Sequence, residues 1–288
     1  MTLKTYELPY GDTVTIVALP EDEVIAEVRT KSFTPIPKEA VKSKILEAIR
    51  NPIGIGPLDE RVKPGDTVCF ICNDLTRVAN SFDFMPVFLD ELHRLGVPDD
   101  HMKIVFSLGA HRKMTRDEMA EAVGEEVAAR VPMFNSDCYA DQDFEYFGQT
   151  THGTPVLINK LLCDVDHVIL TGTIVFHYFA GFGGGRKAIL PGCAAMETIR
   201  MNHQWMMDDR VGLGITTGNP CYEDQVEGVE RFAKGRDLFL FNAVLNAKHE
   251  FLRMYAGHWV KAHLEACKFV REVYGVPIPR EADLVIVS

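Results

Sequence analysis

The chain has 288 residues, of which 47% are hydrophobic and 25% charged, a composition that suits a soluble protein of about one large or two smaller domains. Its formal net charge of −11 disfavours a nucleic-acid partner, because binding to a phosphate backbone requires a concentrated Lys/Arg surface. No apolar run of about 18 residues is present and the start, MTLKTYELPYGD, lacks the pattern of an export signal, so we expect a cytoplasmic protein without a membrane partner.

Hydrophobic periodicity predicts strands that alternate with helices along the chain. The predicted strands, most of them short and rich in Val, Ile and Phe, are residues 13–19, 67–72, 103–108, 167–171 and 238–245. The predicted helices are residues 40–50, 84–95, 115–123, 194–207, 222–233 and 259–274, and Thr115 with Glu118 fits a capping box. This order indicates an α/β fold of the Rossmann-like kind, in which helices flank a mainly parallel sheet and ligands gather beyond the carboxyl ends of strands.

The cysteines do not change this interpretation. All seven are irregularly spaced, which does not indicate a disulfide framework and agrees with a protein in a reducing compartment. Cys69 and Cys72 form a CxxC in VCFICND, which could indicate zinc or redox chemistry. No second CxxC exists, and VCFIC is typical of a buried strand in which cysteine is a small hydrophobic residue.

Polar motifs follow three of the predicted strands. NDLTR (73–77) follows VCFIC, GAHRK (109–113) follows KIVFSL, and GTIVFHYFAGFGGGRK (172–187) follows HVILT. We therefore expect their ionisable side chains to meet in one crevice. In the first motif, Asp74 can cap a turn or hold a ribose hydroxyl, and Arg77 can bind a carboxylate through two parallel hydrogen bonds. A helix-capping Asp–Arg ion pair is the alternative.

Two histidines, His111 and His177, each come shortly after a predicted strand. An imidazole, with its ordinary pKa of about 6.5, can take or give a proton near neutrality. Two of them on opposite sides of a substrate could work in either direction. A pair of satisfied core histidines is the alternative, which the apolar neighbours of His177 favour for that residue alone.

The glycine-rich segment GFGGGRK (181–187) combines close backbone approach at Gly184 and Gly185 with the cations Arg186 and Lys187, as a phosphate site requires. It matches neither a Walker loop, since Ala188 follows the lysine, nor the GxGxxG pattern. A mobile hinge is the alternative. Lys187 could also be a nucleophile if desolvation lowers its pKa.

The helix after this segment ends near His203, whose neutral imidazole is a suitable ligand for nickel, copper or zinc. A histidine interacting with the helix dipole is the alternative. At the far end of the chain, a Pro-rich connector leads into ADLVIVS, which has the composition of a buried strand. We expect residues 1–275 to form one cofactor-binding α/β domain, and 276–288 to be a linker and the first strand of a C-terminal domain that is largely missing. An edge strand of the first domain is the alternative.

Taken in order, NDLTR, GAHRKMT, TGTIVFHYFAGFGGGRKAILPGCAAMETIRMNH and GNPCYED resemble the N-terminal domain of the nickel-dependent lactate racemase family, over roughly residues 70–225. The resemblance implies an isomerase that racemises or epimerises a small 2-hydroxyacid. It implies a nickel-pincer nucleotide, pyridinium-3-thioamide-5-thiocarboxylic acid mononucleotide, obtained from cofactor-synthesis proteins. The implied mechanism is reversible hydride transfer from the substrate Cα to this cofactor through a planar 2-keto acid.

The resemblance also implies a role for each candidate residue. Lys187 matches the lysine that attaches to the cofactor through a thioamide, and His203 matches the protein ligand to nickel. His111 and His177 match the catalytic acid/base pair. Asp74 matches a residue that holds the cofactor, and Arg77 one that binds the substrate carboxylate.

Two features limit what the resemblance implies. Val78-Ala79-Asn80 follow Arg77 where the family often has prolines, which leaves the substrate preference open. Family members also carry a C-terminal domain that supplies a substrate-binding lysine, so we expect weak or no turnover from these 288 residues alone.

Two alternatives from other classes remain at this point. One is a zinc-type hydrolase with His111, His177 and His203 as three metal ligands. The other is a non-catalytic module that binds a nucleotide or phosphate and uses the histidines structurally. The sequence does not identify which 2-hydroxyacid a racemase of this kind would take.

Overall fold

The structure, a computed structural model, describes residues 2–287 and divides the chain into two compact units. The large unit spans residues 33–271. The small unit combines the segment before residue 33 with the segment after residue 271. The domain boundary that we predicted between residues 275 and 276 stays a prediction.

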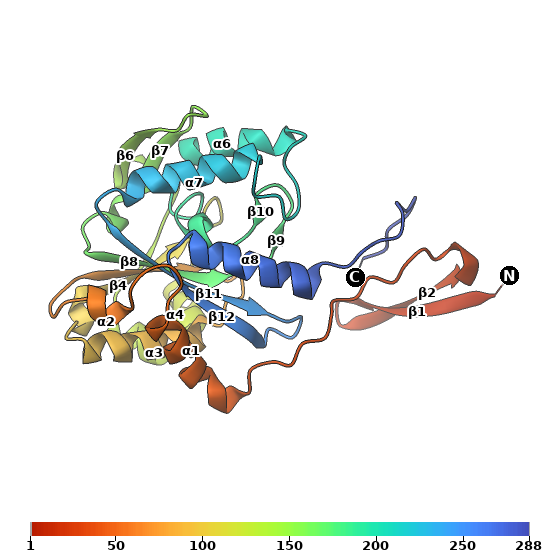
Figure 1. The fold of residues 1–288 in the computed structure, drawn as a ribbon, viewed down its shortest axis with the longest axis horizontal. Helices are drawn as coiled ribbons and strands as arrows, with labels where there is room; N and C mark the ends of the chain where they lie inside the picture. Colours follow the sequence, from red (N-terminus) through yellow and green to blue (C-terminus); the bar gives the residue numbers. More distant parts are fainter. Residues whose placement is uncertain (1, 288) are drawn as a thin grey trace. The chain divides into compact units, whose positions relative to one another are not determined.

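A six-stranded sheet forms the centre of the large unit (Figure 1). Its strand order is β12 (Phe251–Gly257), β11 (Asp237–Leu245), β8 (His167–Thr173), β3 (Val68–Asn73), β4 (Met102–Ser107) and β5 (Met133–Asn135). Every neighbouring pair is parallel except β11 with β12. The predicted α/β class with a mainly parallel sheet is therefore confirmed.

Helices cover both faces of this sheet, because its central strands bury side chains on both sides. One face packs against α1 (Val41–Arg50), α2 (Leu58–Arg61), α3 (Ser81–Arg94), α4 (Arg116–Val123) and α5 (Glu125–Arg130). The other face packs against α6 (Met196–His203), α7 (Pro220–Ala233) and α8 (Lys261–Tyr274). Successive residues of β3 alternate between the two cores, Phe70 in the first and Ile71 in the second.

Most of the predicted elements form. The five predicted strands correspond to β2, β3, β4, β8 and β11, and the six predicted helices to α1, α3, α4, α6, α7 and α8. The capping box is confirmed, since Thr115 Oγ1 accepts from the Glu118 amide at 3.2 Å and the Glu118 carboxylate accepts from the Thr115 amide at 2.8 Å. Cys69 and Cys72 are buried in β3, as expected of a core strand.

Several elements are absent from the predictions, and the apolar run at the C-terminal end forms no strand within the described residues. The unpredicted strands include β1 (Leu3–Tyr10), β6 (Phe144–Gln149), β7 (Pro155–Asn159), β5 and β12. The predicted helix 194–207 is shorter, since α6 ends at His203 and a 3₁₀ turn follows. Residues 283–287 are irregular, with Leu284 and Val287 exposed at 73% and 85%, because no described strand pairs with them. Ser288 lies outside the described residues.

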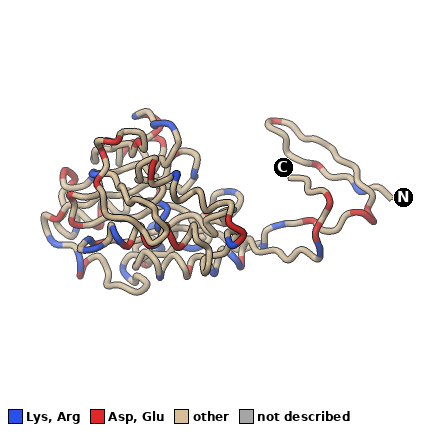
Figure 2. The backbone as a smooth tube through the Cα atoms, turned by 90° about the horizontal axis from the view of Figure 1, so that it is seen from above, with Lys and Arg blue, Asp and Glu red and all other residues tan. Residues whose placement is uncertain are grey.

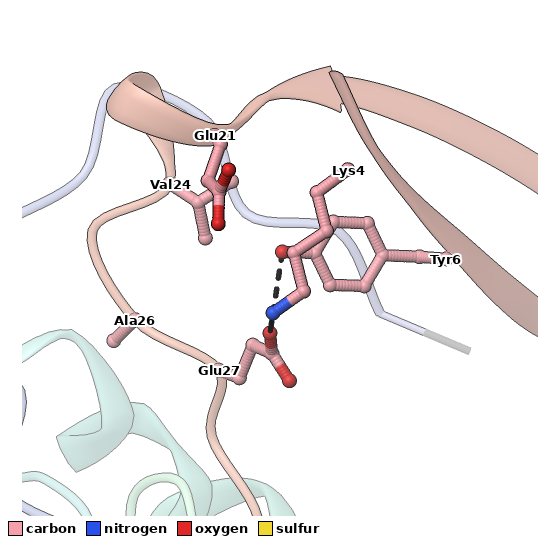
Figure 3. Close-up of a pocket in the computed structure, with 6 residues that line it drawn as sticks. All are labelled: Lys4, Tyr6, Glu21, Val24, Ala26 and Glu27. Carbon is pink, nitrogen blue, oxygen red and sulfur yellow. Dashed lines mark hydrogen bonds and ion pairs between the residues drawn. The ribbon is translucent and has the colours of Figure 1, made fainter. Parts of the chain in front are cut away.

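The small unit contains the antiparallel hairpin of β1 and β2 (Thr13–Pro20). A cavity of about 260 Å³ lies in this unit, lined by Lys4, Tyr6, Glu21, Val24, Ala26 and Glu27 (Figure 3). The Lys4 ammonium is already paired with Glu27, so this cavity offers an anionic ligand no free cation. None of the predicted site residues lines it.

Two further observations bear on partners. None of the helices within residues 2–287 combines the length and apolar character needed to cross a bilayer. Acidic and basic positions are interspersed along the backbone, without a long stretch of one sign (Figure 2).

Candidate active site

The three motif-bearing segments leave the sheet at one edge. Strands β8, β3 and β4 are neighbours, with Leu170 opposite Ile71 and Ser107 opposite Asn73. Because these strands are parallel, the loops after them begin side by side. The loop after β4 is also joined to the segment after β8 by a 3.0 Å bond from the Gly109 amide to the Gly192 carbonyl. The three motifs therefore begin next to one another at the carboxyl ends of β8, β3 and β4, as we predicted.

Asp74 and His111 form a close pair across two of these loops. The Asp74 Oδ2 and His111 Nδ1 atoms are 2.5 Å apart, and Asp74 Oδ1 accepts from the amide and hydroxyl of Thr76 at 3.1 and 2.7 Å. An ionised carboxylate accepts from Nδ1–H, which leaves Nε2 of a neutral His111 as a proton acceptor. Both Asp74 oxygens are thus engaged within the chain, and its role in holding a cofactor stays a prediction.

His177 lies just beyond β8, in a small hairpin of β9 (Phe176–His177) and β10 (Gly181–Phe182). Its Nδ1 accepts from the Ala180 amide at 3.3 Å, so its neutral ring carries the hydrogen on Nε2. Burial lowers the pKa of His177 to about 3, and the nearby cations of Lys187 and Arg77 act in the same direction. His177 is therefore neutral near pH 7.

Lys187 is placed in the 3₁₀ turn Gly185–Ala188 that follows β10. Its Nζ lies 5.6 Å from the centroid of the Phe179 ring, and no described residue forms a hydrogen bond or an ion pair with that amine. Burial lowers the pKa of Lys187 to about 7, and the charges of Arg186 and Arg77 act in the same direction. In a large share of the molecules, the Lys187 amine is therefore uncharged and nucleophilic near pH 7.

Arg186 points into the protein, and its predicted contact with a phosphate of the cofactor stays a prediction. Only 2% of the residue is exposed. Its Nη2 donates to the carbonyls of Ala180 and Phe182 at 2.7 and 3.3 Å, and its guanidinium carbon lies 3.9 Å from the Tyr222 ring centroid. Its Nε and Nη1 have no partner among the described residues. Burial lowers the pKa of Arg186 only to about 10, so it remains a cation.

The glycines before Arg186 pack against protein as well. A Cβ on Gly184 would lie 2.7 Å from Asn242 Oδ1, and a Cβ on Gly185 would lie 2.6 Å from the His263 ring. The Gly185 amide already donates to Asn242 Oδ1 at 2.7 Å. Close internal packing and positive φ angles of 70° and 55° thus account for both glycines within the chain, and their contact with a phosphate stays a prediction.

His203, at the end of α6, completes the group of titratable residues. Its ring centroid lies 5.0 Å from that of Phe179, and its Nδ1 is buried without a hydrogen-bond partner among the described residues. Burial, with Lys187 acting in the same direction, lowers the pKa of His203. The ring is therefore poised to be neutral, the form in which imidazole binds a metal.

One residue that the sequence gave no reason to choose joins these groups. The Phe179 ring lies 4.6 Å from His177, 5.0 Å from His203 and 5.6 Å from Lys187 Nζ. Arg77 belongs to the same neighbourhood, since its charge lowers the pKa of both His177 and Lys187. The site thus combines an amine and two imidazoles around an aromatic ring, with the Arg77 charge acting on two of these groups.

The zinc-hydrolase alternative lacks a ligand set. Within residues 2–287, no group of three His, Cys, Asp or Glu side chains lies close enough to hold a metal ion. His111, His177 and His203 therefore do not converge as three zinc ligands, which must meet within a single coordination sphere.

Comparisons with known proteins agree with these observations. Residues 10–214 match the model of the lactate racemase N-terminal domain. Lactate racemases from Thermoanaerobacterium thermosaccharolyticum and Lactiplantibacillus plantarum are each 31% identical to this chain, over 284 and 274 residues. These matches cover 98% and 94% of this chain but 66% and 63% of the relatives, so the chain spans about two thirds of their length.

Two solved structures resemble the fold. The lactate racemase apoprotein from Thermoanaerobacterium thermosaccharolyticum matches with a TM-score of 0.84 and 29% identity, over 94% of this chain and 63% of that chain. A protein from Thermotoga maritima matches with a TM-score of 0.68 and 20% identity, over 83% of this chain and 60% of that chain. The second likeness shows the fold alone.

Proposed function

Because the chain belongs to the lactate racemase family, we propose that it carries a nickel-pincer nucleotide and works in the racemisation or epimerisation of a 2-hydroxyacid. The observation that supports this most is the state of Lys187. An amine that is buried, held near a pKa of about 7 and free of ion pairs is the group that covalent attachment requires. Lactate, the acid in the names of the two relatives, is the first substrate to test.

The residues present fit the proposed cofactor. Lys187 provides the amine for the thioamide bond, and the unpartnered, buried Nδ1 of His203 marks an imidazole with spare capacity for a metal. The same Phe179 ring contacts both residues, so one ligand can reach both. A cofactor that needs only one protein ligand to its nickel also agrees with the lack of a three-residue metal site in the described chain.

When bound, the cofactor supplies a hydride acceptor for the substrate Cα, and the side chains of this chain manage the protons. His111 takes the hydroxyl proton at Nε2, and Asp74 stabilises the imidazolium that forms. His177 presents its Nε2–H from the other loop, so in this tautomer it donates to the substrate, and it serves as the second base only after this hydrogen moves to Nδ1 and the bond from Ala180 is released. Inversion requires a base for each face of the substrate, and His177 is the candidate for the second face.

Arg77 binds the substrate carboxylate in this proposal. Its cation acts on both His177 and Lys187, so it lies within electrostatic reach of the reacting groups. A guanidinium can hold a carboxylate through two parallel hydrogen bonds and so orient the hydroxyl-bearing carbon. A bound carboxylate would also offset the effect of the nearby cations on the pKa of His177, although burial, the largest cause of its low pKa, remains.

The proposal is tested by the intact mass of the protein produced together with the cofactor-synthesis proteins. We expect an adduct with the mass of the nucleotide, mapped to Lys187 by peptide analysis, and no adduct in Lys187→Arg. Lys113→Arg is the matched control, because Lys113 is an exposed lysine paired with Asp137. An unmodified wild-type mass, or an adduct that persists in Lys187→Arg, would contradict the proposal.

Nickel content tests the second assignment. We expect His203→Ala to keep the adduct on Lys187 but to lose most of the nickel, measured per protein by elemental analysis. His152→Ala is the control, since His152 is a partly exposed histidine whose ring contacts Trp205. Full nickel content in His203→Ala would remove His203 from the metal site.

A further inference from the structure

The loop that presents Lys187 is held from behind by two buried side chains. Asn242, in the middle of β11, accepts the Gly185 amide at 2.7 Å through Oδ1. His263, in α8, donates from Nε2 to the Gly183 carbonyl at 2.9 Å. The Asn242 side chain is fully buried and His263 is 2% exposed. Both lie outside residues 10–214, which match the family's N-terminal domain.

The donor role of His263 is fixed by its surroundings. Burial lowers the pKa of His263 to about 3, and the Arg186 charge acts in the same direction, so the ring is neutral. The thiol of Cys267, one helical turn later, lies 3.6 Å from His263 Nδ1 and can donate to it. With Nδ1 accepting, the single ring hydrogen is on Nε2, which faces the Gly183 carbonyl.

A glycine-rich loop needs such bonds to adopt one conformation. Glycine loses more backbone freedom on ordering than any other residue, and Gly183, Gly184 and Gly185 are consecutive. The two side chains also fill the space that the missing Cβ atoms leave, since added Cβ atoms would clash with Asn242 and His263. The glycines and the two polar residues therefore form one complementary unit.

We propose that Asn242 and His263 are positioning residues that fix the Gly183–Lys187 loop and so hold the Lys187 amine at the Phe179 ring. The importance of that position rests on the proposed function of Lys187. Neither residue touches a reacting atom in this arrangement. They act through the loop backbone.

The position of Lys187 can be followed by NMR of protein labelled with ¹³Cε-lysine. In the wild type we expect one lysine Cε–Hε resonance displaced from those of exposed lysines, because the end of Lys187 lies against the Phe179 ring. Its loss in Lys187→Met assigns it. In Asn242→Leu and His263→Leu we expect this resonance to move into the range of the exposed lysines.

Conservative variants and a matched control separate positioning from general loss of stability. His263→Gln retains an N–H donor near the position of Nε2 and should keep the displaced resonance, whereas the shorter side chain of His263→Asn should not. Asn159→Leu is the control, because Asn159 is likewise a buried asparagine whose Oδ1 accepts a backbone amide, that of Leu161 at 3.0 Å. It should lower the thermal midpoint without moving the Lys187 resonance.

The inference is overturned if the displaced resonance stays in place in folded Asn242→Leu and His263→Leu, or if Asn159→Leu moves it equally. If the leucine variants do not fold, identical spectra for His263→Gln and His263→Asn overturn it. An adduct test on the same proteins distinguishes the two proposals. A wild type without adduct whose Lys187 resonance responds as expected contradicts only the proposed function, and an adduct with an unresponsive resonance contradicts only this inference.

Discussion

Strand β8 begins and ends next to histidines in opposite electrostatic situations. At its start, His167 has a carboxylate on each ring nitrogen, with Asp66 at 2.8 Å from Nε2 and Asp237 at 2.6 Å from Nδ1. Beyond its end, His177 has no carboxylate, and the cations of Lys187 and Arg77 act on it. The two histidines are both buried and are separated by nine residues.

The two ends of β8 differ in whether carboxylates compensate the buried basic side chains. At the amino edge of the sheet, acidic residues satisfy the histidine, as is usual for buried polar groups. At the carboxyl edge, Arg186, Lys187 and His203 are buried or partly buried without an acidic partner among the described residues. Uncompensated groups with shifted pKa values are a feature of functional sites, and they leave this edge ready for an anionic ligand.

The largest expected effect is on catalysis at the carboxyl edge. Any racemisation by the cofactor-loaded chain should fall by about 10²–10⁴-fold in His177→Gln, the usual contribution of a positioned acid or base, which takes the weak turnover expected of these 288 residues to background while the Lys187 adduct still forms. His111→Gln should behave alike. Unchanged rates in both would favour the non-catalytic module, in which the histidines are structural.

The next effect is on stability and its dependence on pH. The pKa of Lys187 is about 7 in the folded chain and about 10.5 when unfolded, so between these values the unfolded chain binds more protons and stability rises with pH. Below pH 7 the full penalty of the buried cation remains. Lys187→Met should therefore stabilise the cofactor-free protein at pH 6 by roughly 2–4 kcal/mol in urea unfolding, less than full burial would give because Lys187 is not completely covered.

The urea comparison has its own control. Lys113→Met removes an exposed lysine and should leave the pH dependence of stability as in the wild type. A wild type whose stability relative to that of Lys187→Met does not increase between pH 7 and 10 would rule out an uncompensated, buried amine at Lys187.

A smaller effect is expected from the carboxylate behind His111. Asp74→Asn keeps the shape of the side chain but removes the charged acceptor of the His111 Nδ1 hydrogen. A hydrogen bond to a charged group contributes roughly 1.5–3 kcal/mol, so the racemisation rate should fall by about 10–100-fold. Asp66→Asn makes the same change at the amino edge and should leave the rate unaltered. Equal losses in both variants would mean that the effect is on folding.

The smallest effect is expected at the amino edge itself. His167→Asn removes two hydrogen bonds to partly exposed carboxylates and should lower the free energy of unfolding by about 1–2 kcal/mol. The adduct on Lys187 should form as in the wild type. A variant with normal stability but no adduct would show that the two edges are coupled.

The sequence predicts the sheet and its site-bearing edge well, because the parallel strands are strong apolar runs and the motifs directly follow them. It does not predict β6, β7 or β12, whose alternation is weaker and whose pairing depends on distant partners. The apolar run at 283–287 shows the converse, since the pattern of a strand is present without a partner in the described chain.

The same limit applies within the site. Residue types and order suffice to select His111, His177, Lys187 and His203, but not to assign their contacts. The direction of Arg186, the engagement of Asp74 with His111 and the central place of Phe179 depend on packing between segments far apart in the sequence. The sequence of a glycine-rich loop with two cations predicts a phosphate site. In the structure, its glycines pack against Asn242 of β11 and His263 of α8.

The bonds from β11 and α8 to the Gly183–Lys187 loop also impose an order of assembly. A chain made from its N-terminus contains Lys187 long before it contains His263, so the lysine emerges at first on an unrestrained loop. Its final environment exists only after the last helix of the large unit has docked. The environment that lowers the pKa of Lys187 therefore forms only once β11 and α8 have packed behind its loop.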